Sequence, residues 1–446
     1  MNIPDVHYAR AGGVAIAYQL VGDGEQTLLF SPQVSDLLTP WLSDHTRPFL
    51  EHLAQTVQLV LLNPRGTGLS DRPRNVTLEA RMDDILSVLD HAGVDRASLM
   101  GISTSANVCA LFAASYPEPV ERLILAHPFP RAIRTETYPW GLDEEGWLAW
   151  IRENRARWGD RDFMEQFARD VDPHLAEDSE ELGWFVWQGR LALSPTAAAD
   201  WARLGMETDI VDILSSIRVP TLILHRPGDS ANETQGAGPA SVVAQRIRDA
   251  HMLALHSDQA SPFSQEAADA VLEFLQHDAP REVPDTVLAT VLFTDLVGST
   301  ERAAALGDRA WRELLTRHHA AVRRELARFR GEEVDTAGDG FFCRFDGPAR
   351  AMACARAIVE GALEHHLEIR AGIHTGECEL VGNKIAGIAV VTGARISSLA
   401  APGEVLVSST VKDLVAGSGF FFDDRGEHEL KGVPGTWRLF AVAEAQ

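Results

Sequence analysis

Two aspartates in the C-terminal third of the sequence stand where carboxylates can serve as metal ligands. Asp295 ends the apolar run 287–295, which is typical of a buried strand, and Asp339 lies in a glycine turn within 334–342. One carboxylate at a strand end and one in a hairpin turn can converge on a pair of divalent cations. Carboxylate oxygens suit Mg²⁺ or Mn²⁺ bound together with substrate phosphates. Taken singly, Asp295 could instead be a helix cap and Asp339 an ordinary turn residue.

Backbone groups beside Asp295 fit the same chemistry. Gly298 and Ser299 precede a helical pattern, and the start of a helix presents N–H groups that bind phosphates. The sequence therefore predicts a phosphate site next to the predicted metal site.

Five short motifs extend this pattern. They lie between Leu288 and Val442 and read FTDLVGST, TAGDGFF, IRAGIHTGE, GARI and ELKGVPG. Together they resemble the catalytic domain of the class III nucleotidyl cyclases, the adenylate and guanylate cyclases. The resemblance implies conversion of ATP or GTP to a cyclic monophosphate and pyrophosphate, with two Mg²⁺ or Mn²⁺ ions held by Asp295 and Asp339. Two-metal catalysis suits phosphoryl transfer, which depends mainly on positioning and charge neutralisation.

The same resemblance assigns roles to three cations and implies a dimer. Arg370 matches a phosphate-binding arginine, Arg395 the arginine that stabilises the transition state, and Lys431 a lysine on the triphosphate. Each could also be a plain surface cation. In this family one subunit supplies the metal aspartates, and the other supplies the base-reading and transition-state residues. A homodimer through this domain is therefore expected.

Three positions depart from the family pattern. Asp335 stands where the family has its adenine-reading lysine, Lys384 where it has the partner acid, and Val391 where an asparagine orients the ribose. The first two resemble an exchange of charges across one pocket, which would complement guanine better than adenine. Valine cannot hydrogen-bond the ribose, so we expect slower turnover. The choice between ATP and GTP stays open.

A serine in the first half of the chain also stands at a position typical of catalysis. Ser103 lies at the sharp turn of LMGISTSAN, which resembles the nucleophile elbow of the α/β-hydrolases. The resemblance covers about residues 10–275 and places the catalytic acid at Asp229. The position of the histidine base is Ala260, and the nearest histidine is His256. Because a serine without a base is a poor nucleophile, we expect a non-catalytic domain, with a working esterase as the alternative.

The elements that must position these residues fall into two α/β units. Up to about residue 275, short apolar runs alternate with helical patterns, which predicts a parallel sheet covered by helices on both faces. Within it, residues 131–215 lack strand patterns and hold seven of the ten tryptophans, so we expect an inserted helical lid. These tryptophans could form a plain helix core or line a pocket for a small apolar ligand.

The second unit begins after a short break. Residues 276–286 contain two prolines and several charges and are interpreted as the linker. The unit that follows, 287–446, is expected to be α+β and ferredoxin-like. Its expected elements are a strand at 287–295, helices through Arg330, a hairpin at 332–346, a helix at 348–363 and a strand at 367–374.

Composition narrows the partners and the surroundings. The net charge of -24 argues against nucleic acid or an anionic membrane as a partner, because phosphates are repelled. Four cysteines without paired spacing predict the reduced, buried thiols of a cytoplasmic protein. The sequence shows no signal-peptide pattern at its start and no apolar run of membrane-spanning length.

Three classes of function remain. The first is a cyclase regulated by a sensor domain with the α/β-hydrolase fold. The second is an esterase with a degenerate cyclase domain, and the third is a ligand-binding protein in which both sites are degraded. The two metal aspartates and Arg395 favour the first class, and Ala260 counts against the second. Val391 and the exchanged pair keep the third class open.

Overall fold

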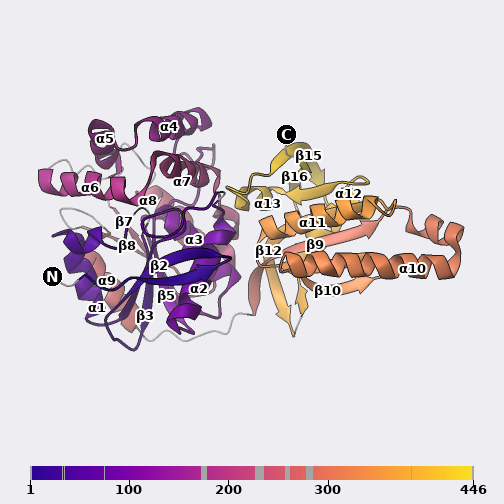
Figure 1. Cartoon of the computed structure of the whole chain (residues 1–446), viewed down its shortest axis with the longest axis horizontal. Coiled ribbons are helices and arrows are strands. Elements are labelled where there is room, and N and C mark those ends of the chain that lie inside the picture. The colour runs from indigo at the N-terminus through magenta and orange to yellow at the C-terminus, as the bar shows by residue number, and fades with distance from the viewer. Residues whose placement is uncertain are drawn as a thin grey trace. The chain divides into compact units, whose positions relative to one another are not determined.

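The chain divides into two compact units, Met1–Pro284 and Asp285–Gln446 (Figure 1). The computed structural model describes residues 3–32, 34, 36–74, 76–171, 178–226, 236–256, 262–277, 285–382 and 384–443. Among these residues, no helix combines the length and the apolar character that a membrane span requires.

The first unit is built on an eight-stranded sheet in the order β1-β2-β4-β3-β5-β6-β7-β8. β1 and β2 pair antiparallel, whereas β3 to β8 pair in parallel, which confirms the predicted parallel sheet. Short apolar runs of the kind that suggested this sheet form β3 to β7. The strands are β1 (His7–Ala11), β2 (Val14–Val21), β3 (Thr27–Ser31), β4 (Gln58–Leu62), β5 (Ala97–Ile102), β6 (Val120–Ala126), β7 (Thr221–His225) and β8 (His251–Ala254).

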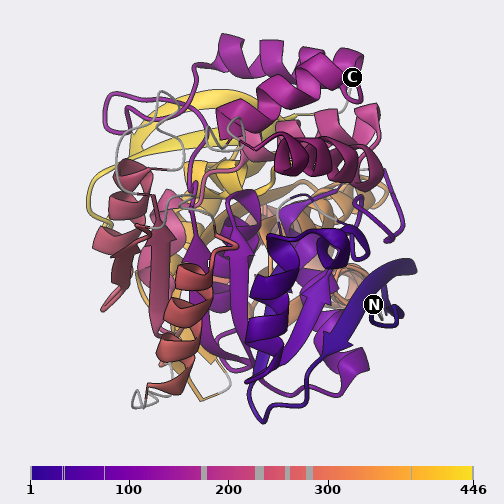
Figure 2. The same cartoon turned by 90° about the vertical axis from the view of Figure 1, so that its left-hand side faces the viewer.

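Helices cover both faces of this sheet, as the strand–helix alternation predicted (Figure 2). α1 (Thr46–Ala54) and α9 (Gln265–Gln276) pack together on one face and enclose a large apolar core with the strands. α2 (Leu78–Ala92) and α3 (Thr104–Ser115) pack on the other face. α8 (Ala237–Arg246) packs against β7 and β8.

Among the described residues, the α-helices α4 to α7 lie between β6 and β7, in the stretch where the sequence predicts a lid (Figure 1). Trp150 contacts Trp147 and Trp201 edge-on, with ring centroids 5.2 and 5.7 Å apart, so part of the tryptophan content forms a helix core. Two short 3-10 helices are also described: η1 precedes α1 in the chain, and η3 follows α7. These elements are η1 (Thr39–Leu42), α4 (Glu144–Arg157), α5 (Arg161–Val171), α6 (Ser179–Ala192), α7 (Pro195–Glu207) and η3 (Val211–Ser216).

The second unit is built on a sheet in the order β10-β11-β9-β12-β14-β16-β15, with β13 paired to β12. Its centre is the long antiparallel pair of β9 and β12, which runs from Leu296 opposite Ile369 to Thr286 opposite Glu379. The strands are β9 (Thr286–Leu296), β10 (Glu332–Ala337), β11 (Gly340–Phe345), β12 (Ile369–Val381), β13 (Lys384–Ala386), β14 (Val405–Ser408), β15 (Phe421–Glu429) and β16 (Thr436–Ala443).

The helices of the second unit are α10 (Ser299–Arg328), α11 (Pro348–Leu363), α12 (Ile388–Leu399) and α13 (Ser409–Leu414). α10 and α11 share one apolar core with the sheet, whereas α12 packs against β9 and β12 in separate clusters. This arrangement confirms an α+β unit after the parallel-sheet unit.

Several element bounds differ from the sequence prediction. The helix at 348–363 has the predicted bounds, and the hairpin lies within 332–346. α10 ends at Arg328 rather than Arg330, and it is broken at Gly307, whose φ of 74° is not helical. β12 continues to Val381 instead of ending near residue 374, because its second half pairs with β9 and then with β13.

All four cysteines are free and buried, which confirms the predicted thiols. Burial raises the pKa of Cys109, Cys354 and Cys378 to about 12. These thiols therefore stay protonated at neutral pH and are poor nucleophiles.

Candidate active site

Asp295 lies near the end of β9, directly opposite Arg370 of β12 in the antiparallel register. The Arg370 guanidinium donates twice to Oδ2 of Asp295, from Nη2 at 2.5 Å and from Nε at 3.0 Å. Both side chains are part-exposed, at 40% for Asp295 and 34% for Arg370. Arg370, for which a phosphate contact was predicted, thus orients the predicted metal ligand in this structure.

Asp339 lies in the tight turn between β10 and β11, where Gly338 has a left-handed backbone with φ of 66°. Its Oδ2 atom is buried and has no hydrogen-bond partner among the described residues. The turn is fastened to α10 by His319, whose Nε2 lies 3.1 Å from the carbonyl oxygen of Gly338. A buried carboxylate oxygen without a partner is costly, and a divalent cation would satisfy it.

The sheet brings the two aspartates to one corner. Thr294 of β9 pairs with Phe341 of β11, so Asp295 and Asp339 follow and precede this pair by one and two residues on adjacent strands. A Cβ atom built on Gly340 would lie 4.0 Å from Oδ1 of Asp295. The second carboxylate oxygen of Asp295 therefore faces the turn that carries Asp339, and this pair of oxygen donors fits a divalent metal site.

The start of α10 lies where a phosphate site was predicted. Gly298 adopts the left-handed conformation, with φ of 68°, and the helix begins at Ser299. No described side chain caps this helix start. Its first N–H groups can therefore bind an anion beside Asp295.

A shallow pocket of about 330 Å³ opens beside this corner, and Asp295, Arg370 and Asp335 are among its lining residues. Its floor is a pair of aromatic rings that sequence reasoning missed: Phe293 and Phe342 are stacked, 4.6 Å apart and 3° from parallel. Phe293 and Phe342 are directly opposite each other on β9 and β11, and opposed residues share one face of a sheet. The phenylalanines in FTD and GFF could therefore have indicated this pair.

The exchanged charges contact each other within one chain. Nζ of Lys384 on β13 lies 3.8 Å from Oδ1 of Asp335 on β10, and both side chains are more than half exposed. Asp335 is directly opposite Phe342 in the register, so the pair stands at the edge of the aromatic floor. An exposed ion pair of this kind contributes little stability and is easily exchanged for other partners.

The remaining predicted cations form a separate group. Arg395 on α12 donates from Nε to the backbone carbonyl of Lys431 at 3.0 Å. Val391 lies one turn earlier on the same helix and is exposed. Within the described part of the chain, none of these three residues lines the pocket beside Asp295.

In the first unit, Ser103 follows β5 with φ of 53° and ψ of −118°, a strained conformation, and it is buried. Gly101 is required there, because a Cβ atom would lie 2.7 Å from the carbonyl oxygen of Ser105. Ser105 fills the position of the last glycine of the elbow and donates to the carbonyl of Pro32 at 3.1 Å. The local geometry is therefore that of an elbow, although the residue that replaces its glycine is larger.

Of the other residues of the predicted hydrolase site, only His256 is among the described residues. Asp229 and Ala260 lie outside the described residues. His256 follows β8, and its backbone N–H donates to both carboxylate oxygens of Glu266, at 2.9 and 2.8 Å. Sequence reasoning missed His127, a buried residue directly after β6, whose strand pairs Ala126 with Ile102 beside Ser103. Its position directly after the apolar run 121–126 was the available signal.

Comparisons with known families assign both units. The model of the adenylate and guanylate cyclase catalytic domain matches residues 282–444. The model of the alpha/beta hydrolase fold matches residues 39–190.

Three similar proteins place these matches in context. An uncharacterized protein of Rhizobium meliloti (strain 1021) is 30% identical over 176 residues, which are 34% of this chain and 17% of that protein. An uncharacterized protein of Mycobacterium tuberculosis (strain ATCC 25618 / H37Rv) is 29% identical over 165 residues, or 34% of this chain and 54% of that protein. The chain thus spans less than two thirds of either relative.

A solved hydrolase of Pseudomonas aeruginosa PA01 has a TM-score of 0.51 and 25% identity, and the match covers 62% of this chain and 100% of that one. The folds of the two units agree with the two family matches. The chain combines an α/β-hydrolase fold with the catalytic domain of the class III nucleotidyl cyclases.

Proposed function

We propose that this protein is a nucleotidyl cyclase that converts a purine nucleoside triphosphate, ATP or GTP, to the 3′,5′-cyclic monophosphate and pyrophosphate. The observation that carries the proposal is the corner where Asp295 faces the turn of Asp339, whose buried oxygen has no described hydrogen-bond partner. The family match of residues 282–444 supports the same activity.

In this proposal Asp295 and Asp339 hold two Mg²⁺ or Mn²⁺ ions. When bound, the ions neutralise phosphate charge and increase the acidity of the ribose 3′-hydroxyl. Arg370 fixes one oxygen of Asp295 and adds positive charge beside the triphosphate. The free N–H groups at the start of α10 bind a phosphate oxygen, and the stacked pair of Phe293 and Phe342 offers an apolar floor.

The complete site needs a second copy of the chain. Arg395 and Lys431 lie together, and among the described residues they do not line the pocket of Asp295. A homodimer through the cyclase domain would bring the cations of one copy to the carboxylates of the other. There they stabilise the negative charge that develops on the leaving pyrophosphate. A monomer would be inactive, and Val391 would make turnover slow because it cannot hold the ribose.

The α/β-hydrolase-fold unit is proposed to be a sensor that regulates the cyclase without catalysis of its own. Without a base in the usual position, the serine of the elbow is a weak nucleophile, whereas the pocket around it can still bind a ligand. Four protonated, buried thiols support a cytoplasmic location, where such thiols stay reduced.

The test is incubation of the purified full chain with Mn²⁺ and each of ATP, GTP, CTP and UTP, with cyclic products separated by chromatography. We expect a cyclic product from a purine nucleotide. The rate per milligram of protein should rise with protein concentration in the range where dimers form. Absence of product from all four nucleotides at high protein concentration would favour the binding-protein alternative.

A further inference from the structure

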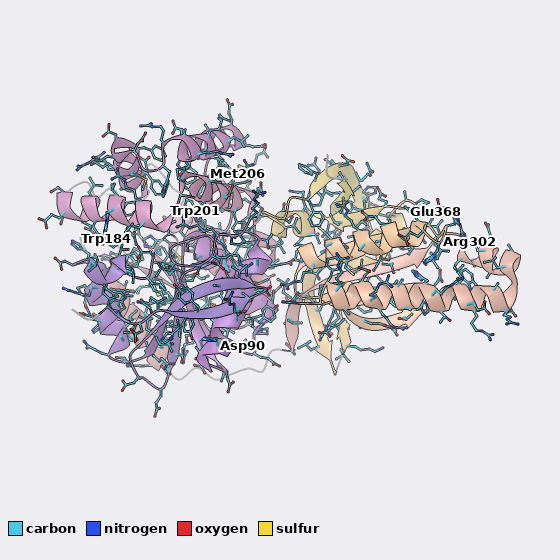
Figure 3. All side chains as sticks on the ribbon, viewed as in Figure 1. Asp90, Trp184, Trp201, Met206, Arg302 and Glu368 are labelled. Carbon is cyan, nitrogen blue, oxygen red and sulfur yellow. The ribbon has the colours of Figure 1, made fainter. Side chains whose placement is uncertain are left out.

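A mainly apolar cavity lies within the first unit, between the lid helices and the sheet. Its lining includes Phe30, Leu50 and Ile102 from the sheet side and Trp158, Met164 and Trp184 from the lid side. Trp184 on α6 and Trp201 on α7, both labelled in Figure 3, also contribute to the wall. The apolar wall of the cavity is therefore formed by two parts of the unit, the sheet side and the lid helices, which are separate in the sequence.

The volume of this cavity limits what can occupy it. The space is about 140 Å³. In another protein, an engineered cavity of about 150 Å³ lined by leucine, isoleucine and phenylalanine stays dry and binds benzene. A ligand of one six-membered ring therefore fits within this volume, which a long acyl chain or a fused-ring compound would exceed.

Several polar groups in the wall already have partners within the protein. The buried carboxylate of Asp36 accepts from the N–H groups of Leu38 and Thr39, at 2.7 and 3.0 Å, and from the Thr39 hydroxyl at 2.6 Å. Gln188 and Arg226 also have partners within the protein. Because these groups already have partners, a charged ligand would lose its hydration without gaining a counter-ion.

The lid is tied to the body at the edge of the same cavity. His45 lies 3.7 Å from Oδ2 of Asp178 and 3.6 Å from Oε2 of Glu181, both at the start of α6. The Trp184 indole donates to the carbonyl of Thr39 at 3.2 Å. An occupant of the cavity would touch the elements that these contacts join, so its presence can bias the position of the lid.

From the size, the mainly apolar wall and the wall carboxylate of Asp36 that already has its hydrogen-bond partners, we infer that this cavity is a receptor site for a neutral, apolar ligand the size of a single six-membered ring. The binding itself stands on the cavity alone. Its regulatory meaning rests on the proposed sensor role of the first unit.

The test uses the full chain and fluorobenzene as the probe, with binding followed by the ¹⁹F line width. We expect one saturable site per chain. Fluorobenzoate, which has the same ring and a carboxylate, should bind about a hundredfold more weakly because its charge would be buried without a partner. No saturable binding of fluorobenzene, or equal affinity for both probes, would overturn the inference.

Two glycines of α6 provide matched variants. A Cβ atom on Gly189 would lie 2.5 Å from Cε of Met164, so Gly189→Ala pushes that flexible side chain in the cavity wall. A Cβ atom on Gly183 meets nothing within 4 Å, and Gly183→Ala gains the same helix propensity without touching the cavity. We expect about tenfold weaker fluorobenzene binding in Gly189→Ala and wild-type binding in Gly183→Ala.

Circular dichroism and the unfolding midpoint show whether both variants are folded. If Gly189→Ala is folded and binds fluorobenzene as well as the wild type, the ring lies elsewhere and the inference is wrong. If Gly189→Ala is unfolded, the comparison of the two probes on the wild type still decides. A cyclase assay in saturating fluorobenzene is scored separately: binding without any change of rate would refute the sensor role but not the receptor site.

Discussion

Nη2 of Arg370 lies 2.5 Å from Oδ2 of Asp295, across two central strands of the second unit. The strand-end carboxylate is therefore held by a cation on one oxygen while its other oxygen faces Gly340. In the proposed cyclase, the oxygens of Asp295 bind the metal, and Arg370 orients the carboxylate.

Replacing Arg370 should affect the turnover rate more than the Mn²⁺ requirement. In Arg370→Gln we expect kcat to fall by about a hundredfold, because charge stabilisation beside the triphosphate is lost. The Mn²⁺ concentration for half-maximal activity should rise only slightly, because Arg370 orients Asp295 but is not itself a proposed metal ligand. The measurement is a Mn²⁺ titration of cyclase rate in both proteins. A large rise in the Mn²⁺ requirement with unchanged kcat would contradict the assignment.

Removing a carboxylate should abolish activity. Asp295→Ala and Asp339→Ala are each expected to lower the cyclase rate below detection while the far-ultraviolet circular dichroism stays that of the wild type. Each variant loses an oxygen donor of the proposed metal site, and neither side chain belongs to an apolar core. Glu368→Ala is the matched control, because Glu368, labelled in Figure 3, is an exposed acid on the same unit. Wild-type turnover in either aspartate variant would reject the metal assignment.

Ser103→Ala should leave the cyclase rate nearly unchanged, because Ser103 belongs to the first unit and no cyclase step requires its hydroxyl. The wild type should hydrolyse p-nitrophenyl acetate slowly or not at all. The assay compares ester hydrolysis and cyclase rate in the same preparations. Brisk hydrolysis that disappears in Ser103→Ala would revive the esterase alternative, and loss of it in His127→Gln would identify His127 as the replacement base.

Stability should fall as the pH falls below about 6.5. Burial lowers the pKa of His374 from 6.5 to about 4, while its Nδ1 contacts the Ser408 hydroxyl at 2.8 Å. The folded chain keeps this imidazole neutral, whereas the unfolded chain takes up a proton below about pH 6.5. The unfolding free energy should therefore decline towards pH 4, by up to about 1.4 kcal/mol per pH unit for this group.

The check is urea unfolding of the full chain from pH 7 to pH 4.5 in the wild type and in His374→Gln. The variant should show a smaller pH slope. The slope should not vanish, because burial also lowers the pKa of His318 to about 4. An identical slope in both proteins would show that His374 does not carry the effect.

The sequence predicted the helices and strands better than the side-chain contacts between them. The helix at 348–363 and the position of Asp295 at a strand end follow from apolar periodicity, which is local. The contact of Arg370 with Asp295 depends on the register of β9 against β12, and residues 75 apart cannot be aligned from their own patterns. The break of α10 at Gly307 could have been suspected from the glycine itself, but a glycine within a helix is often tolerated.

The last prediction concerns the choice of base. In the usual adenine pocket a lysine donates to ring N1 and a carboxylate accepts from the exocyclic amine. In guanine, N1 carries a hydrogen and O6 is an acceptor, so Asp335 can accept from N1–H and Lys384 can donate to O6. The two side chains are 3.8 Å apart and more than half exposed, so a base can displace their mutual contact at a cost of about 1 kcal/mol or less.

We therefore expect the wild type to prefer GTP over ATP, by about tenfold in kcat/KM, and the double variant Asp335→Lys, Lys384→Asp to shift towards ATP. The matched control exchanges Glu332 and Arg344, an ion pair of the same hairpin that does not line the described pocket. Glu332→Arg, Arg344→Glu should keep the wild-type preference, because its charges do not face the base. The measurement is kcat/KM for both purine nucleotides in the three proteins. A wild type that prefers ATP, or a double variant at 335 and 384 that does not move towards ATP, would show that these residues pair with each other and do not read the base.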